Sequence, residues 1–353
     1  DCPEGVTPSF DLQGAHLCAG FIDAHCHLGV FGDSLGFEGE DGNECTDPCT
    51  PHLRSIDAIN PLDRGFSDAR SAGVTTVATG PGSANPIAGQ YTAMKTTGNC
   101  VDDMVIMAPL SMKFALGENP KSVYHDRRET PTTRMATAAI IRENLYLTNE
   151  YWEKIQRAEE DEDENPPDYD AKLEALLPLL KKELPMHIHA HRADDILTGV
   201  RIAKEFDLDF VIVHGSEGHL IAEHLKGVAV ITGPNFGSRS KPELQNLSLE
   251  NSHKLCEAGA RVAICTDHPE TPIEYLPLCG SLAVRGGMSP EQALLAITRI
   301  PAEILGLSRR IGTLAPGKDA DFVITTGHPL DFTSKVIAVF INGKQVEGEP
   351  IPC

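Results

Sequence analysis

The residues of this sequence best suited to chemistry are histidines and an aspartate at the ends of strand-like runs. The first are His25 and His27, in the run FIDAHCHL over residues 21–28. Strand side chains alternate between two faces, so these histidines share a face, about 7 Å apart along the backbone. Two such imidazoles can bind one metal ion. A surface strand with polar outer positions has the same spacing, so the pair alone is a weak signal.

Later strand-like runs supply more side chains of the same kind. In chain order these are Lys113, Glu118, His187, His189, His191, His214 and Asp267. Parallel strands of a barrel deliver their carboxyl ends to one face, where residues far apart in sequence meet. Imidazole and carboxylate suit Zn²⁺ or a similar divalent ion, which can activate a water for attack. The set therefore predicts a metal site at the mouth of a barrel.

The elements that would position these residues alternate between strand and helix. Strand-like runs cover residues 21–28, 74–79, 88–97, 105–116, 184–191, 210–214, 228–232 and 261–266. Helical patterns separate several of them, including 132–157, 194–206 and 249–258, and another covers 289–305. Eight strands close a barrel, so the fold class is α/β, a (β/α)₈ barrel of the TIM type over residues 21–308.

The two chain ends have a different pattern. After residue 312, short runs at 322–325 and 336–343 are separated by tight turns, including Asn342-Gly343, without intervening helices. This arrangement predicts a small antiparallel β-sandwich domain formed by residues 1–20 and 309–353 together.

Composition limits the partners. The formal charge of −21 argues against nucleic acid and anionic membranes, which attract clustered Lys and Arg. No apolar run approaches the roughly 20 residues that span a bilayer. Ten cysteines without a disulfide-like spacing favour a cytoplasmic location. We expect a small-molecule substrate, and the sequence leaves the oligomeric state open, with a homo-oligomer among the alternatives.

Five segments together resemble a known family. They are FIDAHCH, PMHIHAH, FVIVHG, ICTDHP and GTLAPGKDADFVI. The chain is similar over residues 11–348 to the amidohydrolase superfamily, and within it to the imidazolonepropionase-like and prolidase-like branch. The resemblance implies a distorted (β/α)₈ barrel, one or two divalent metals, foremost zinc, and hydrolysis at an amide-like carbon. The family has more sandwich strands before the FID segment, so we expect the small domain to be incomplete.

The resemblance also implies roles for individual residues. The metal ligands would be His25, His27, His189, His214 and Asp267. Asp267 would also be the general base toward water, and then the acid toward the leaving nitrogen. His214 would bind a second metal or polarise the substrate carbonyl.

The family's bridging ligand on the fourth strand corresponds to one of two residues. Lys113 would have to be carboxylated, and a bare ammonium would be costly within its apolar strand. Glu118 needs no modification. We favour Lys113 slightly, and a Glu118 bridge or a single-metal site stays open.

The substrate is the least defined part of the prediction. Tyr124, His125 and Arg134 follow the fourth strand and could contact an anionic substrate group. His191 and Arg192, at the end of the fifth strand, are the other two candidates for substrate contact. Exposed arginines are more often solvated or paired with acids. The reaction predicted is metal-dependent hydrolysis of a dipeptide, an N-acyl amino acid or a lactam-like cyclic amide. A deaminase of a purine-like heterocycle and a non-catalytic barrel are the alternatives.

Overall fold

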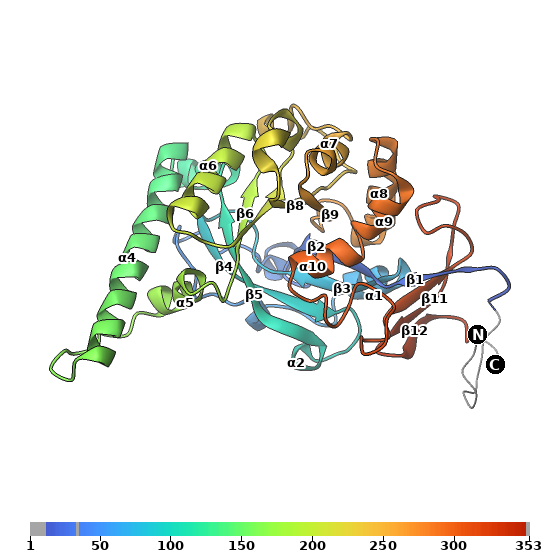
Figure 1. Ribbon diagram of the computed structural model, residues 1–353, viewed down its shortest axis with the longest axis horizontal. Coiled ribbons are helices and arrows are strands. Elements are labelled where there is room, and N and C mark those ends of the chain that lie inside the picture. The colour runs from blue at the N-terminus through green and yellow to red at the C-terminus, as the bar shows by residue number, and fades with distance from the viewer. Residues whose placement is uncertain (1–11, 33–34, 351–353) are drawn as a thin grey trace.

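An eight-stranded sheet, in which each strand pairs with the next along the chain, is the centre of the fold (Figure 1). The structure is a computed structural model that describes residues 12–32 and 35–350. Its first and last strands also contact each other, so the sheet nearly closes into a barrel. The strands are β2 (Phe21–Cys26), β3 (Val74–Thr79), β4 (Ile87–Lys95), β5 (Val105–Ala115), β6 (Met186–Ala190), β7 (Phe210–His214), β8 (Ala229–Thr232) and β9 (Arg261–Ile264).

The direction of β4 differs from the prediction. β4 is antiparallel to both β3 and β5, whereas the other neighbouring pairs are parallel. A parallel connection needs a crossover of a dozen or more residues, and residues 80–86 are too few to provide one. The predicted barrel class is therefore confirmed, but the expectation that all eight strands run in parallel is wrong for β4.

Helices surround the barrel (Figure 1). They are α1 (Arg64–Ser71), α2 (Val101–Met104), α3 (Glu118–Arg127), α4 (Arg134–Glu160), α5 (Ala171–Leu180), α6 (Ala193–Glu205), α7 (Asn251–Glu257), α8 (Leu276–Arg285), α9 (Pro290–Leu295) and α10 (Arg299–Ile304). The helix expected over 289–305 is two helices, α9 and α10. None of the helices within the described ranges is long and apolar enough to cross a membrane.

Residues from both ends of the chain form a second, antiparallel sheet, as predicted. Its order is β1 (His16–Ala19), β10 (Phe322–Thr325), β11 (Val336–Ile341) and β12 (Lys344–Gly348). The turn between β11 and β12 has positive φ at both Asn342 and Gly343, the conformation that an Asn-Gly hairpin favours. Residues 1–11 and 351–353 of the predicted small domain lie outside the described residues.

A buried ion pair joins this sheet to the barrel. Lys95, the last residue of β4, contacts the carboxylates of Asp321 and of Asp319, the latter at 2.9 Å. The side chains of Lys95 and Asp321 are each only 5% exposed. The other oxygen of Asp321 accepts a hydrogen bond from the backbone N–H of Asn342 at 2.9 Å. The ammonium of Lys95 therefore compensates the negative charge of the buried Asp321 carboxylate at the junction of the two sheets.

Replacing Lys95 with Met is expected to lower the free energy of unfolding by about 3 kcal/mol, because it leaves Asp321 buried without a cation. Chemical denaturation measures this change. The control is Arg310→Met, since Arg310 pairs with Asp319 at 3.0 Å but is 49% exposed, and its loss should cost less than about 1 kcal/mol. Equal losses in the two variants would contradict this account of the junction.

Alternate residues of the strand β6 face the outer core and the interior of the barrel. Met186 and Ile188 pack in the core between the barrel and its helices. The alternate residues His187 and His189 therefore point to the interior. The segment MHIHA thus presents its histidines to the inside of the barrel at the level of the neighbouring Lys113 and Ala115.

Candidate metal centre

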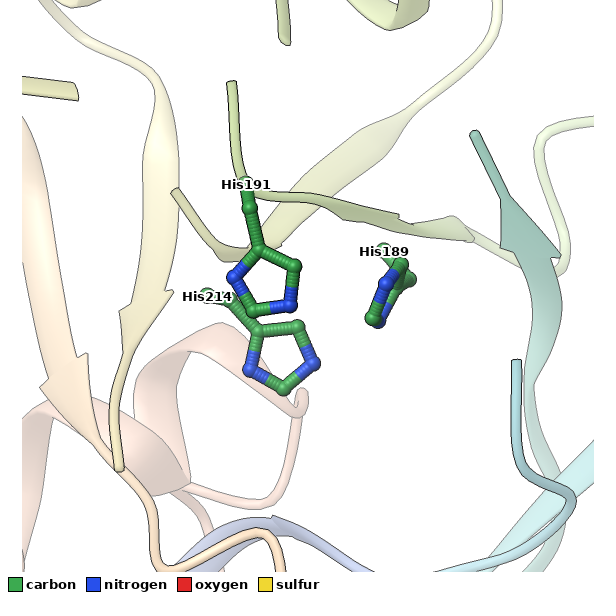
Figure 2. Close-up of side chains that lie close together, drawn as sticks. All are labelled: His189, His191 and His214. Atoms are coloured by element: carbon green, nitrogen blue, oxygen red, sulfur yellow. The ribbon is translucent and has the colours of Figure 1, made fainter. Parts of the chain in front are cut away.

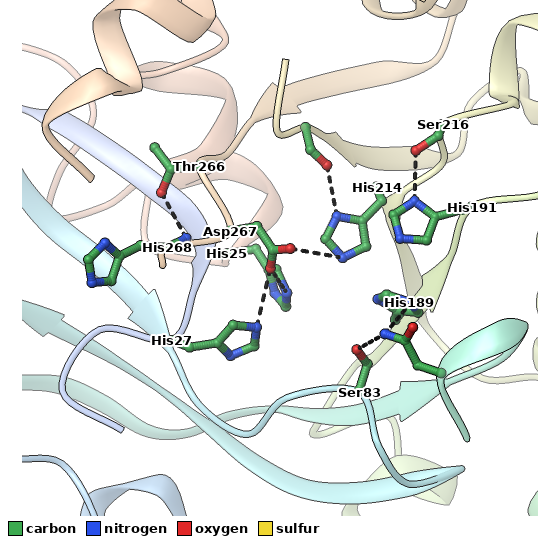
Figure 3. A network of polar contacts seen from close by, with 12 residues as sticks. His25, His27, Ser83, His189, His191, His214, Ser216, Thr266, Asp267 and His268 are labelled. Carbon is green, nitrogen blue, oxygen red and sulfur yellow. Dashed lines mark hydrogen bonds and ion pairs between the residues drawn. The ribbon is translucent and has the colours of Figure 1, made fainter. Parts of the chain in front are cut away.

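The first pair of histidines faces an aspartate from the other edge of the barrel. His25 and His27 lie at the end of β2, and Asp267 follows β9. The Asp267 Oδ1 atom is 3.4 Å from His25 Nε2 and 3.2 Å from His27 Nε2 (Figure 3). Backbone bonding holds these segments together, since the N–H of Asp267 donates to the carbonyl of His25. The predicted convergence of these three residues is what the structure shows.

Three further histidines gather beside this group. His189 and His191 come from the end of β6 and the residue after it, and His214 ends β7 (Figure 2). One nitrogen of each lies within 4.8 Å of the others. The rings of His191 and His214 are stacked with centroids 4.6 Å apart, and His189 stands edge-on to both. His191, predicted as a substrate contact, thus lies among the candidate ligands.

Asp267 and His214 connect the two groups. The Asp267 Oδ2 atom is 4.0 Å from His214 Nε2. Both residues have positive φ values, 56° for Asp267 and 69° for His214, a conformation that costs energy in residues other than glycine. Such strain is concentrated at functional sites, and here it lies at the two residues that join the histidine groups.

In three of the histidines, His27, His191 and His214, the protein holds the ring nitrogen that faces away from the centre. The Nδ1 atom of His27 bonds to the carbonyl of Gly80 and that of His214 to the carbonyl of Gly233, each at 2.8 Å. The Nδ1 atom of His191 bonds to the Ser216 hydroxyl at 2.7 Å. A carbonyl accepts only from a protonated nitrogen, so His27 and His214 carry their proton on Nδ1 and leave Nε2 as a free acceptor. This is how metal-binding histidines are normally oriented.

The charges of the site also fit a divalent cation. Burial lowers the pKa of His25, His189 and His191 well below the usual range, and lowers that of His214 to about 4. Burial alone would raise the pKa of Asp267, but His214, His25 and His27 hold it well below its usual range. At neutral pH these four imidazoles are therefore neutral and the Asp267 carboxylate is ionised, which are the states that bind metal.

A buried nitrogen of His214 also indicates that the site is suited to a cation. The Nε2 atom of His214 is buried and has no hydrogen-bond partner among residues 12–32 and 35–350. Burying a polar atom without a partner is unfavourable, and a cation at this position would satisfy it. The residues present therefore fit a metal centre.

The structure separates the two candidates for the bridging position. Lys113 is fully buried, and its Nζ atom is 3.1 Å from His25 Nε2. Burial lowers the pKa of Lys113 to about 8, so part of it is the neutral amine that carboxylation requires. Glu118 begins α3, and its carboxylate instead accepts a hydrogen bond from the backbone N–H of Glu243. Of the two, Lys113 is the one that contacts a candidate ligand histidine, His25.

A cavity of about 770 Å³ opens onto the candidate metal centre. His27, His189, His191 and Asp267 line its inner end, and its other lining residues include Ser83, Asn119 and Lys241. A cavity of this size suits a small-molecule ligand.

Of the five predicted substrate contacts, His191 alone lines this cavity. Tyr124 is buried, and its hydroxyl donates to Asn85. Arg134 pairs with Asp195 and Arg192 with Asp194, and His125 is exposed on α3. In this structure, then, four of the five lie away from the cavity that opens onto the candidate ligands.

Three side chains near the centre have no counterpart in the sequence prediction. Tyr91 of β4 stacks on His25 with ring centroids 5.1 Å apart. Asp23 is buried and accepts hydrogen bonds from the backbone and hydroxyl of Thr266, next to Asp267. Glu243 lies close to His189 and His191. The position of Asp23, two residues before His25 on the same strand face, is the one signal that could have identified any of them.

The comparison with known proteins agrees with this architecture. The Amidohydrolase family model matches residues 16–346. An amidohydrolase structure from Thermotoga maritima MSB8 superposes with a TM-score of 0.95 at 41% identity, covering 99% of this chain and 91% of that one. A prolidase complexed with N-methylphosphonate-L-proline has a TM-score of 0.55 at 18% identity, covering 99% and 90%, which shows a shared fold alone.

Curated relatives point the same way. Amidohydrolase tasK of Hapsidospora irregularis is 28% identical over 97% of this chain and 37% of its own length. Imidazolonepropionase of Geobacillus kaustophilus (strain HTA426) is 42% identical over 21% of this chain and 18% of its own length. The chain thus spans less than two fifths of the first relative, and its match to the second is a short segment. With the family model matched over nearly the whole chain, the protein belongs to the amidohydrolase family.

Proposed function

We propose that this protein is a metal-dependent hydrolase that cleaves the C–N bond of an amide or cyclic amide. The observation that carries the proposal is the position of Asp267, which faces His25, His27 and His214 at the inner end of the cavity. Two divalent cations, most simply zinc, would be held by the two residue groups, His25–His27–Asp267 and His189–His191–His214. Carboxylated Lys113 is proposed as the group between them.

The metal supplies acidity, since a bound divalent cation lowers the pKa of water to about 7. The protein supplies the proton transfers. Asp267 is ionised and its side chain is 13% exposed, so it can accept the proton of a water that attacks the substrate carbonyl. The same carboxyl group can then donate that proton to the leaving nitrogen. His214, 4.0 Å from Asp267, carries its proton on Nδ1 and would hold the second cation through its free Nε2 atom.

The substrate proposed is a small molecule of the dipeptide, N-acyl amino acid or lactam-like class. The neutral hydrogen-bonding groups of Ser83 and Asn119 line the cavity, and so does the ammonium of Lys241. Such convergent polar groups within a mostly formed pocket fix the orientation of a ligand. We also propose a cytoplasmic location, in keeping with the cysteine pattern.

A substrate panel tests the proposal. The zinc-loaded protein is assayed with dipeptides, N-acyl amino acids, cyclic amides and purine-like amines, while amine, carboxylate and ammonia release are followed separately. We expect cleavage of members of the first three classes with release of a carboxylate. Ammonia release confined to the heterocyclic amines would identify a deaminase instead, and no turnover in any class would contradict the proposal.

A further inference from the structure

A buried carboxylate, Glu243, faces the metal centre but has no part in the mechanism above. It lies in the short 3₁₀ turn η5 (Pro242–Leu244), within the loop that connects β8 to α7. Its exposed fraction is 0%. Burying a carboxylate is costly unless it is paired or binds a metal, so the contacts that hold it in place indicate what it does.

One carboxylate oxygen is fixed by the start of α3. Glu243 Oε2 accepts a hydrogen bond of 3.0 Å from the backbone N–H of Glu118. In return the backbone N–H of Glu243 donates to Glu118 Oε2 at 3.2 Å. Gly117 makes this approach possible, because a Cβ atom there would lie 2.8 Å from Glu243 Oε2, and its φ is +89°. The local structure thus holds Glu243 in one orientation.

The second oxygen points at His189 of β6 and at His191, the residue that follows this strand. Glu243 Oε1 is 3.6 Å from His191 Nε2 and 3.9 Å from His189 Nε2. Among the residues that the structure describes, no contact of this oxygen has hydrogen-bond geometry, but it is paired with a cationic side chain. The Lys241 ammonium lies 2.8 Å away in an ion pair and also donates to Asn119 Oδ1 at 2.9 Å.

This arrangement repeats the one around Asp267. There, one carboxylate oxygen faces a His-x-His pair at 3.4 and 3.2 Å. Two ligands that bind one tetrahedral zinc ion are separated by about 3.4 Å, given bond lengths of about 2.1 Å. Each His-x-His pair, His25–His27 and His189–His191, therefore faces its own carboxylate oxygen at close to the spacing of a shared ion.

We propose that Glu243 is a further ligand of the cation held by His189, His191 and His214. The inference rests on the metal centre of the proposed function. A cation bound there takes the place of Lys241 at Glu243 Oε1, while Lys241 keeps its bond to Asn119. The loop over residues 233–250 is then tied to the metal. In the rival account, Glu243 serves only to pair with Lys241 and anchor the loop.

Zinc binding to the metal-free protein separates the two accounts. Stoichiometry is measured by elemental analysis, and affinity by competition with a chromophoric chelator. We expect Glu243→Gln to weaken the binding of one of the two zinc ions by clearly more than about 100-fold, because loss of a residue that only orients a ligand typically costs about 10–100-fold. The matched control Glu118→Gln alters the same loop contact but leaves the Glu243 carboxylate intact, and should bind zinc within about threefold of the parent.

Lys241→Met gives the sharpest contrast. If Glu243 binds the cation, removing the competing ammonium leaves zinc affinity unchanged or higher. If Glu243 only pairs with Lys241, this variant and Glu243→Gln weaken zinc binding alike. Cobalt(II) provides a second readout, since its visible absorption reports ligand number and geometry and should change in Glu243→Gln but not in Glu118→Gln.

Three results would overturn the assignment: parent-like zinc binding by Glu243→Gln, equal weakening in Glu118→Gln, or equal weakening in Lys241→Met. Circular dichroism and thermal unfolding without zinc confirm that each variant is folded. A parent chain that binds no zinc would refute the metal centre of the proposed function. A parent and a Glu243→Gln variant that both bind two ions equally well would refute only the role of Glu243.

Discussion

Asp267→Asn is expected to reduce kcat/KM by about 10³- to 10⁴-fold on every substrate that the parent hydrolyses. Asparagine keeps the shape of the side chain but cannot accept a proton from water or pass it to the leaving nitrogen, and general acid–base catalysis alone contributes about 10²- to 10⁴-fold. The carboxylate also faces His25 and His27 at 3.4 and 3.2 Å, so its loss weakens the metal site as well.

The matched control for this variant is Glu270→Gln. Glu270 lines the same cavity three residues further along the chain, but it is exposed and belongs to neither candidate ligand group. Its substitution should change kcat/KM by less than about tenfold. Steady-state kinetics of both variants, with zinc content measured in parallel, separates loss of the base from loss of the metal. Equal rates for Asp267→Asn and the parent would show that another residue is the base.

Removing the metal is expected to abolish turnover and to destabilise the fold. The apo site holds several buried imidazoles at close range, and the Nε2 atom of His214 has no hydrogen-bond partner within the described ranges. A ligand that binds only the folded state stabilises it by about 4 kcal/mol at a thousandfold excess over its Kd. Dialysis against a chelator should therefore lower the midpoint of thermal unfolding, and added zinc should restore both stability and activity.

Magnesium is the appropriate control for the zinc addition, because it prefers oxygen ligands and binds imidazole sites poorly. Recovery with zinc but not magnesium supports the histidine centre. Full activity after metal has been removed, as confirmed by elemental analysis, would contradict a role for the metal in turnover.

The sequence predicted the strands of the barrel well because their signal is local. In the segment MHIHA, alternation places Met186 and Ile188 in the outer core and His187 and His189 inside. The direction of β4 was missed because the pattern of a strand does not encode which way it runs; the short link of residues 80–86 was the one signal against a parallel crossover. Helix α5 was also missed, since Pro178 lies inside it and an acidic, proline-rich stretch precedes it.

The same distinction applies to the site. The meeting of His25, His27, His189, His214 and Asp267 could be predicted because strand ends converge in a barrel, whatever the loops do. Glu243 was not predicted, because it lies in a loop whose sequence resembles an exposed one. Its carboxylate is held near the centre by a hydrogen bond from the backbone of Glu118, which is 125 residues away in the sequence. The choice between Lys113 and Glu118 likewise needed coordinates, since both lie near the end of β5 and only the contact with His25 separates them.

The most direct test of the metal centre is an anomalous difference map, recorded at the zinc absorption edge from crystals of the zinc-loaded protein. Two peaks are expected at the mouth of the barrel. One should lie within bonding distance of His25, His27 and Asp267, and the other of His189, His191 and His214. No peak at the barrel mouth, or peaks bound only by residues elsewhere, would contradict the account.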